Sequence, residues 1–294
     1  MGRVTVGLLH PGEMGGAVGA CARARGARVL WVSEGRSAST RGRADAAGLE
    51  DTKTLAALVA ASEVILSICP PHLAVDVARA VAAHRFAGVY MDANAVAPAT
   101  ARQIGAIVEQ AGAAFVDGGI VGAPPHAPGT ARLYLSGREA RRVANLFESG
   151  NLEAIALNDS PGAASALKMA YAAYTKGSIA LLMAIRALAA REGVDEALLS
   201  EWERSQPDLP ARSEQMVRNN ARKAWRFVGE MEEIAASFED AGLPGGFHQA
   251  AAEIYRRLES YKDTSAPPSV ADVVASLTPS EPSHGPPRTA RRSG

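Results

Sequence analysis

The sequence predicts an α/β protein, with an N-terminal Rossmann-type doubly wound sheet followed by an all-α C-terminal domain that is entered through a long helix. Short apolar runs alternate with Ala-rich helical segments through the first half of the chain, as expected for successive βαβ units. The segment 160–194 has the composition of one long helix, and helical patterns continue after it. We therefore predict a dinucleotide-binding domain over residues 1–159, a helical substrate and dimerisation domain over 160–277, and a disordered tail over 278–294.

Composition and charge narrow the class of protein. The chain of 294 residues carries 31 basic and 31 acidic side chains, so no overall charge favours nucleic acid or an anionic membrane as a partner. We find no apolar run long enough to span a bilayer and no secretory signal pattern. The two cysteines, Cys21 and Cys69, match no metal-binding spacing. We predict a reduced, cytoplasmic protein without a metal site.

The first strand, turn and helix have the arrangement of a dinucleotide-binding unit. A buried strand over 4–9 is followed by a glycine-bearing turn, a helix and a second strand over 27–32. The GxGxxG fingerprint keeps Gly12 and Gly15 but has His10 in place of its first glycine. A GxxG turn also occurs without a ligand, yet the βαβ setting favours a pyrophosphate site at the positive end of the helix. The predicted cofactor contacts are His10, Pro11, Gly12, Glu13 and Met14.

The end of the second strand indicates which dinucleotide binds. An acidic residue there binds the ribose of NAD, whereas a nearby arginine accommodates the 2′-phosphate of NADP. The spacing places Ser33 at this position, followed by Arg36 and Ser37, so we expect NADP as the cofactor. Glu34 keeps NAD as an alternative, because a shift of one residue would make it the ribose ligand.

Further strands are predicted over 63–69, 87–91, 113–116, 133–135 and 153–157. Polar or glycine-rich segments follow several of these strands, and ligands of open α/β sheets bind beyond the carboxyl ends of strands. Any one segment is compatible with ordinary turn chemistry, but their shared placement favours a site. The residues expected to contact the cofactor here are Cys69, Pro70, Pro71 and Asn94.

One lysine stands out in the long predicted helix. Pro161 suits the first turn of this helix, and Ser160 or Asp159 would cap it. Lys168 follows in almost continuous apolar surroundings, where a lysine is costly unless it is paired or functional. The alternative is a lysine that extends to solvent from the helix end. The apolar remainder of the helix, 179–188, predicts packing against the helical domain or a second subunit.

After residue 194 the pattern predicts helices over 195–204, 211–241 and 246–262. His248 follows a Pro-Gly-Gly turn and is a candidate substrate residue. We interpret the large apolar and aromatic side chains as core, namely Tyr171, Tyr174, Trp225, Phe227, Met231 and Phe238. The acidic side chains of the middle helix, Glu230, Glu232 and Glu233, are expected on a solvated face; in a cleft, one could bind a cationic or hydroxylated substrate.

Four segments give the chain a resemblance to the β-hydroxyacid dehydrogenase family, which includes 3-hydroxyisobutyrate and 6-phosphogluconate dehydrogenases. The family's opening loop, GLGxMG, resembles residues 10–15, and its DxSTxxP segment resembles 92–98. Its substrate loop is similar to 117–123, and the glycine and lysine of its catalytic helix resemble Gly162 and Lys168. The C-terminal half resembles a 6-phosphogluconate-dehydrogenase-like branch of the family.

The resemblance implies a nicotinamide cofactor, with Lys168 as the general acid/base of a hydride transfer. The chain departs from the family at three places: Val121 replaces a serine, Ala172 replaces an asparagine, and a second lysine expected near 229–230 is absent. Tyr171 lies three residues after Lys168 and shares its helix face. The resemblance also implies substrate contacts from Gly118, Gly119, Ile120, Val121 and Gly122. The catalytic candidates are Lys168, Tyr171 and Asn94.

The leading hypothesis is an NADP-preferring oxidoreductase that acts on a small hydroxy acid or its keto form. One alternative is an imine reductase, because those enzymes share this architecture. Another is a cofactor-binding protein without turnover, which the lost family residues would explain. We also predict a homodimer that forms through the long helix and the C-terminal domain.

Overall fold

The computed structural model describes residues 3–278, which form two compact units. Of the described residues, the sheet unit comprises 3–175 together with 229–249, and the helical unit comprises 176–228 together with 250–278. The two units therefore interleave along the sequence, whereas we predicted successive segments, 1–159 and 160–277. Apart from Thr278, the predicted disordered tail lies outside the described residues.

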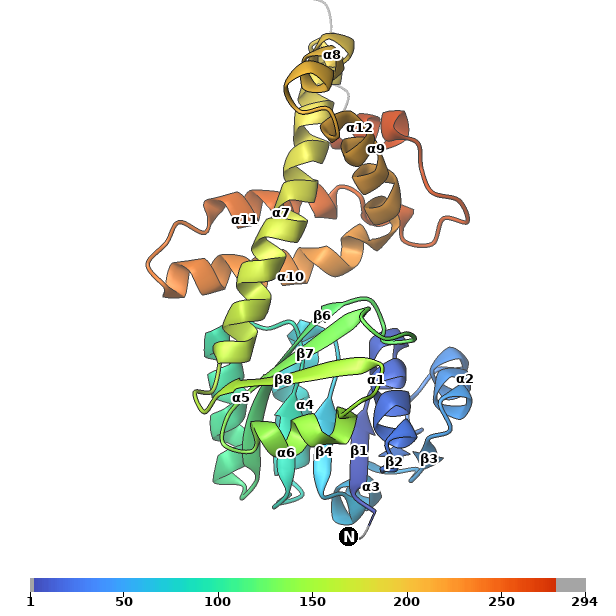
Figure 1. Cartoon of the computed structure of the whole chain (residues 1–294), viewed down its shortest axis with the longest axis vertical. Helices are drawn as coiled ribbons and strands as arrows, with labels where there is room; N and C mark the ends of the chain where they lie inside the picture. The colour runs from blue at the N-terminus through green and yellow to red at the C-terminus, as the bar shows by residue number, and fades with distance from the viewer. Residues whose placement is uncertain (1–2, 279–294) are drawn as a thin grey trace, which may run out of the picture. The chain divides into compact units, whose positions relative to one another are not determined.

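The sheet unit is built on one eight-stranded sheet with the strand order β3-β2-β1-β4-β5-β6-β7-β8 (Figure 1). Neighbouring strands are parallel except β6 and β7, which are antiparallel. The order confirms the predicted doubly wound α/β class. The strands are β1 (Thr5–Leu9), β2 (Arg28–Trp31), β3 (Glu50–Asp51), β4 (Val64–Ser67), β5 (Val89–Asp92), β6 (Ala114–Gly122), β7 (Ala131–Ser136) and β8 (Leu152–Asn158).

Helices cover both faces of this sheet and bury an apolar cluster on each (Figure 1). Central strands such as β4 are buried along their whole length, which explains why they read as continuous apolar runs. The sequence did not predict β3, which is short and acidic, or α3. The covering helices are α1 (Glu13–Ala24), α2 (Ala38–Ala46), α3 (Leu55–Ala61), α4 (Ala74–Ala82), α5 (Pro98–Gln110) and α6 (Ala140–Ala144), with short 3-10 turns η1 (Pro71–Leu73) and η2 (Asn145–Phe147).

The predicted substrate loop belongs to a strand. We expected a strand over 113–116 that ended in a loop over 117–122, but β6 continues to Gly122 and pairs with β7 over that stretch. An antiparallel partner extends the ladder beyond the carboxyl ends of the neighbouring parallel strands. As a result Ile120 and Val121 are buried, while Gly122 is exposed at the strand end.

The long helix α7 (Ala163–Arg191) begins after Gly162, which has a positive φ of 94°. Its 29 residues make it about 44 Å long. The prediction that Ser160 or Asp159 caps this helix is wrong. The N–H of Ala164 donates to the hydroxyl of Ser136 at the end of β7, so the cap comes from a distant strand.

Two tyrosines of α7 were wrongly interpreted as core. Tyr171 is 48 % exposed and Tyr174 is 67 % exposed, because they lie on the helix face that no described segment covers. Their neighbours Ala172 and Ala173 are the residues that face the interior. The sequence could not separate these positions, since almost every side chain of the helix is apolar or small.

The C-terminal helices differ from the prediction in two respects. The expected helix over 211–241 is divided by a 3-10 turn, and α12 was not predicted, although Ser269 and Asp272 form a capping box at its start. The elements are α8 (Asp195–Ser205), α9 (Leu209–Asn220), η3 (Ala221–Lys223), α10 (Ala224–Asp240), α11 (Gly246–Arg256), η4 (Glu259–Tyr261) and α12 (Val270–Leu277). No helix among those the structure describes is long and apolar enough to cross a membrane.

Three side-chain interpretations for α10 are resolved. Met231 is fully buried, as expected for a core residue, whereas Trp225 is 36 % exposed. Glu233 does not lie on a solvated face: its carboxylate accepts a hydrogen bond from the N–H of Ala97 at 2.6 Å. Ala97 is the N-cap residue of α5, so Glu233 caps the helix that follows β5.

Candidate functional site

A row of polar residues crosses the middle of the sheet at the carboxyl ends of its parallel strands. Cross-strand register aligns Leu9 with Ser67, Ser67 with Asp92, Asp92 with Asp117, and Asp117 with Ser136. The four polar members of this row are all 1 % exposed or less. Burying a polar group in a sheet core costs free energy unless the group is hydrogen-bonded. This row is therefore our candidate for the functional site.

Asp117 attaches the start of α7 to the sheet. One carboxylate oxygen accepts the N–H of Ser165 at 2.9 Å and the Ser136 hydroxyl at 3.1 Å. The other oxygen accepts the Ser165 hydroxyl at 2.5 Å. A buried carboxylate is also favoured at the positive end of a long helix. Asp117 therefore fixes the first turn of α7 relative to β6 and β7.

Lys168 lies one turn further along α7 and is partly buried. The backbone of Gly119 packs directly beneath it: a methyl group at Gly119 would lie 3.0 Å from Cβ of Lys168 and 2.7 Å from the carbonyl oxygen of Ala164. Within residues 3–278, no hydrogen bond or ion pair engages the Lys168 ammonium. Burial lowers the pKa of Lys168 to about 8. Such an amine exchanges a proton readily near neutral pH.

Asn94 and Asp92 join the ends of β4 and β5. The Asn94 amide donates to the Asp92 carboxylate at 2.6 Å and to the Ser67 hydroxyl at 3.2 Å. Its oxygen accepts the N–H of Cys69 at 2.5 Å. Asn94 is 3 % exposed, so its amide is fully used within the fold. The geometry makes Asn94 a residue that orders two strand ends.

Two titrating groups of this network are shifted toward their neutral forms. Burial, together with the nearby charge of Asp117, raises the pKa of Asp92 to about 7 despite the opposing hydrogen bonds from Asn94. Burial, with the charge of Asp92, raises the pKa of the Cys69 thiol to about 12. Cys69 is therefore a neutral thiol at physiological pH and contributes its backbone N–H rather than a thiolate.

The glycine-bearing turn after β1 has the backbone of a cradle. His10 adopts a left-handed conformation with φ of 67°, which glycine adopts without strain, so a glycine is expected at this position of the GxGxxG fingerprint. A methyl group at Gly15 would lie 2.4 Å from the carbonyl oxygen of His10, so only glycine fits there. A methyl group at Gly12 would meet open space, and no side chain caps α1. These features fit a pyrophosphate at the start of α1.

Two buried nitrogens beside this turn have no hydrogen-bond partner within residues 3–278. They are Nδ1 of His10 and Nε of Arg36. Burial and the charge of Arg36 lower the pKa of His10 to about 4, so its imidazole is neutral at pH 7. Buried polar atoms without partners are rare in folded proteins, and a polar ligand is one way to satisfy them. Their presence supports the fit of a dinucleotide to these residues.

The predicted ribose-phosphate residues surround the end of β2. Ser33 is buried, and its N–H donates to the Asp51 carboxylate at 3.2 Å. Ser37 caps α2 by accepting the N–H of Thr40 at 3.3 Å. Arg43 reaches back from α2 to the carbonyl oxygen of Pro11 at 3.3 Å, which joins this region to the glycine-bearing turn.

The remaining predicted site residues are dispersed. Pro71 begins η1 and lies near Gly229, where an added methyl group would be 3.7 Å from it. His248 lies in the first turn of α11, with its ring 4.3 Å from that of Phe238, and its Nδ1 has no hydrogen-bond partner among the described residues. Among the described residues, no hydrogen bond joins His248 or Tyr171 to the Lys168 ammonium. These two assignments remain predictions.

The sequence alone did not identify several residues of the site. Ser67 and Ser136 read as ordinary strand residues, and Ser165 as part of an apolar helix. Asp117 was noted only as the start of a loop. Ser67 and Ser136 could have been noticed because each is the last residue of its strand. That they line up with Asp92 and Asp117 depends on the register of the sheet, which the sequence does not show.

Comparison with protein families matches both halves of the chain. Residues 5–150 match a model described as the NAD binding domain of 6-phosphogluconate dehydrogenase. Residues 189–258 match a model described as a domain of unknown function, DUF1932. The first match contains the glycine-bearing turn and the polar row.

Comparison with individual proteins agrees with these matches. A curated relative, an uncharacterized 28.5 kDa protein from Methanothermus fervidus, is 28% identical to this chain over 59% of the chain. The match spans 66% of that relative, which is slightly less than two thirds of its length. A solved conserved protein of unknown function, described as structurally similar to 3-hydroxyacid dehydrogenases, is 28% identical with a TM-score of 0.67, covering 88% of this chain and 98% of its own. The 3-hydroxyisobutyrate dehydrogenase of Mycobacterium tuberculosis has the same fold, with 18% identity, a TM-score of 0.69, and coverage of 94% and 99%.

Proposed function

Because the chain belongs to the β-hydroxyacid dehydrogenase family, in a divergent branch that joins the NAD binding domain to DUF1932, we propose that it is an NAD(P)-dependent oxidoreductase acting on a small hydroxy acid or its keto form. The observation that carries this proposal is the setting of Lys168. It is an unpaired, partly buried amine with a pKa near 8, on a helix anchored to the polar row.

In this proposal Lys168 moves the proton that accompanies hydride transfer. For alcohol oxidation, its neutral Nζ accepts the hydroxyl proton of the substrate; for reduction, its ammonium donates that proton to the forming alkoxide oxygen. The nicotinamide, when bound, accepts or supplies the hydride. Gly119 supports this role because its lack of a side chain lets α7 approach the sheet and bring Lys168 to the strand ends.

The cofactor would be held by the turn between β1 and α1 and by the end of β2. The N-terminus of α1 would bind the pyrophosphate, and the unpartnered nitrogens of His10 and Arg36 would gain polar partners. NADP is favoured because the residue after β2 is the neutral Ser33, with Arg36 close behind it. Asp51, which faces the Ser33 N–H, is already paired with Lys53 at 2.6 Å, and Glu34 is exposed.

Residues around Lys168 would position the substrate. Tyr171 is exposed on the helix one turn beyond Lys168, beside Ala172, which replaces the family's asparagine. We assign Asn94 a positioning role, because its amide is occupied by Asp92, Ser67 and Cys69. Of the predicted substrate loop, Gly118 and Gly119 lie against neighbouring backbone, and Val121 leaves no hydroxyl where the family has serine.

A homodimer through α7 forms part of the proposal. The large exposed side chains of this helix are Tyr171, Tyr174, Leu181 and Leu188. Together with the half-buried Ser178 and Ile185 they repeat with alternating spacings of three and four, which is the pattern of a helix-packing seam. An exposed apolar stripe of this kind along one helix indicates an interface.

Two other functions use the same fold. Solved imine reductases share it, and the missing family asparagine and serine would suit a changed substrate. The retained Lys168 favours a hydroxy acid. A cofactor-binding protein without turnover would also keep the cradle around Gly12 but would have no use for an unpaired amine at Lys168.

Two measurements test the proposal. Titration of protein fluorescence with NADPH and NADH should show binding of both, tighter for NADPH, with the difference reduced in Arg36→Ala. A screen of hydroxy acids, keto acids and imines should then yield a turnover that Lys168→Met lowers and Lys223→Met, an exposed lysine of the helical unit, does not. Failure of both nucleotides to bind would overturn the proposal; binding without Lys168-dependent turnover would favour the non-enzymatic alternative.

A further inference from the structure

The helical unit contains a basic pocket that has no part in the proposed reaction. It is a hollow of about 450 Å³. Its wall is formed by one aromatic and five cationic side chains, Trp225, Arg218, Arg222, Lys223, Arg226 and Lys262, with a single carboxylate from Asp263. This concentration of positive charge stands out in a chain whose basic and acidic residues balance.

The sequence accumulates these cations over a short distance. Arg218, Arg222 and Arg226 succeed one another at intervals of four residues, from the end of α9 through η3 into α10. Like charges at this spacing repel each other on a helix, at a cost of about 0.2–0.5 kcal/mol per pair. Arg222 and Lys223 are exposed, and neither forms an ion pair within the described residues. The cationic side chains of this segment therefore repel one another, and a bound anion would reduce that repulsion.

Trp225 organises the pocket. The Nζ of Lys262 lies 4.2 Å from the centre of the Trp225 ring, and the guanidinium carbon of Arg226 lies 5.2 Å from it. Lys262 belongs to the segment after η4, so the aromatic ring draws a distant cation into a cluster that is already positive. Charge repulsion alone would disperse these groups, whereas the ring holds them around one cavity.

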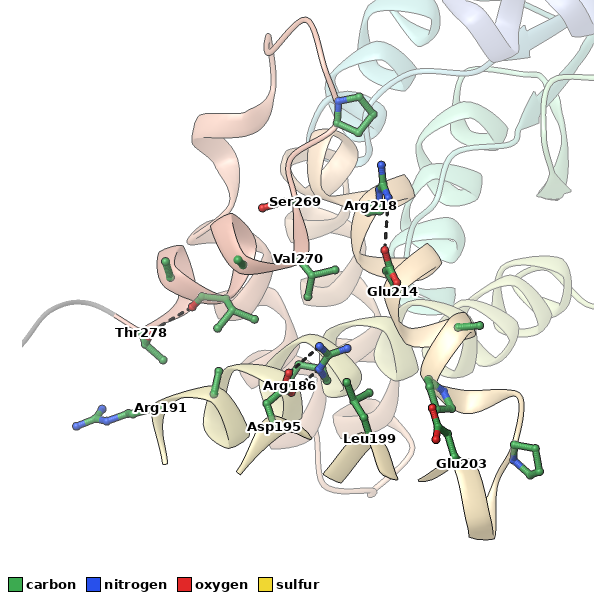
Figure 2. A pocket seen from close by; sticks show the side chains of 18 residues that line it. Arg186, Arg191, Asp195, Leu199, Glu203, Glu214, Arg218, Ser269, Val270 and Thr278 are labelled. Atoms are coloured by element: carbon green, nitrogen blue, oxygen red, sulfur yellow. Dashed lines mark hydrogen bonds and ion pairs between the residues drawn. The ribbon is translucent and has the colours of Figure 1, made fainter. Parts of the chain in front are cut away.

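A neighbouring hollow shows the ordinary arrangement of charges. It has a volume of about 1030 Å³ and shares Arg218 and Pro267 with the basic pocket. There Arg186 forms two hydrogen bonds to Asp195, at 2.6 and 2.9 Å, and Arg218 pairs with Glu214 at 3.4 Å (Figure 2). Its buried arginine is thus satisfied by the chain itself. Within the part of the chain that the structure describes, three cations of the basic pocket, Arg222, Lys223 and Lys262, have no acidic partner, and a bound anion would supply one.

We propose that the basic pocket binds a small, multiply charged phosphate-bearing anion. Guanidinium forks and ammonium groups from several directions match the tetrahedral oxygens of phosphate groups. The volume falls within the range of small-ligand sites, about 300–1,000 Å³, and suits a compact molecule. Nucleic acid is disfavoured because the charge is confined to one hollow of a neutral chain.

Trp225 provides a reporter for the test, with pyrophosphate as the probe. Trp31 and Trp202 are buried, so the exposed Trp225 should dominate any change caused by a ligand in the pocket. We expect pyrophosphate, added at constant ionic strength, to change the emission with saturation, and Trp225→Phe to lose that change. The double substitution Arg222→Gln and Lys262→Gln should weaken binding at least tenfold. Arg204→Gln, which removes an exposed cation of α8 outside the pocket, should leave it unchanged.

The same titration defines the results that would overturn the proposal. Sulfate at equal ionic strength should give no comparable saturation; an equal response would reduce the effect to general screening. No saturable response to pyrophosphate, or equal weakening by Arg204→Gln, would also refute it. Binding that persists in the double variant and that NADP⁺ displaces would place pyrophosphate at the turn around Gly12 instead. Circular dichroism of each variant, whose changed side chains are exposed, verifies the fold.

Discussion

The backbone of Gly119 on β6 lies directly against the side chain of Lys168 on α7. A methyl group at Gly119 would sit 3.0 Å from Cβ of Lys168 and 2.7 Å from the carbonyl oxygen of Ala164. The strand and the helix can approach this closely because Asp117, two residues earlier on β6, binds Ser165 of the helix. The candidate acid/base is therefore positioned by a strand that the sequence analysis had treated as a loop.

Gly119→Ala should displace the start of α7. The carbonyl of Ala164 is backbone and cannot rotate away, so overpacking should lower the free energy of unfolding by about 1–3 kcal/mol and reduce turnover together with it. Urea denaturation measures the first effect. The control is Gly42→Ala in α2, where a methyl group meets open space and should stabilise the helix by up to about 1 kcal/mol. Equal behaviour of the two variants would contradict the packing.

The pH dependence of turnover should report Lys168. Because burial lowers its pKa to about 8, kcat/KM for alcohol oxidation should rise with pH and level off above about 8, as the neutral amine forms. Reduction needs the protonated amine, so its kcat/KM should fall above the same pH. Lys168→Met should remove this titration and slow turnover by about 10²–10⁴-fold. A pH profile that persists in the variant would assign the titration to another group.

Asp92→Asn should change how stability depends on pH. Burial raises the pKa of Asp92 to about 7, so its stabilising contribution is complete only below the ordinary range near 4 and is lost as pH rises through 7. Relative to the variant, the wild type should lose up to about 1.4 kcal/mol per pH unit between these limits. Urea denaturation at pH 5 and pH 8 measures this.

The comparison with Asp92→Asn isolates one group, because all other titrating residues are common to both proteins. Asp45→Asn, at an exposed position of α2, serves as the matched control for the removal of one carboxylate. A difference between wild type and Asp92→Asn that is the same at both pH values would contradict the raised pKa of Asp92.

His10→Gly should be more stable than His10→Ala. Both variants remove the imidazole, but alanine keeps a Cβ in the left-handed conformation at φ of 67°, which costs about 1 kcal/mol relative to glycine. Thermal or urea unfolding of the two variants measures this difference directly. The order should reverse at position 42, where glycine has an ordinary helical backbone and alanine is preferred. If His10→Ala were as stable as His10→Gly, the turn would not require this conformation.

Leu181→Glu combined with Leu188→Glu should convert the proposed dimer to a monomer. Both leucines are exposed, at 44 % and 62 %, so the change should not disturb the isolated chain. Burial of a leucine contributes about 1.5–3 kcal/mol, so losing two should weaken association at least about 100-fold. Sedimentation equilibrium measures the mass. Ala190→Glu, exposed on a different face of α7, should remain dimeric; a monomeric wild type would refute the interface.

Local patterns in the sequence determined most of the fold class. Parallel strands buried on both faces must be apolar throughout, so β1, β4 and β5 could be recognised without the structure. The cradle was also readable, because tight turns and close backbone approach require Gly12 and Gly15 at fixed spacing. The unusual lysine, Lys168, was visible because a charge in an apolar helix is costly.

Only the tertiary structure decided how the site is assembled. Whether Ser67, Asp92 and Asp117 form one row depends on cross-strand register, which no short segment encodes. The cap of α7 comes from β6 and β7, and the cap of α5 comes from Glu233, far along the chain. The exposed face of α7 follows from which helices pack against it. These features depend on contacts between distant residues, whereas the sequence pattern reports only the preferences of neighbouring ones.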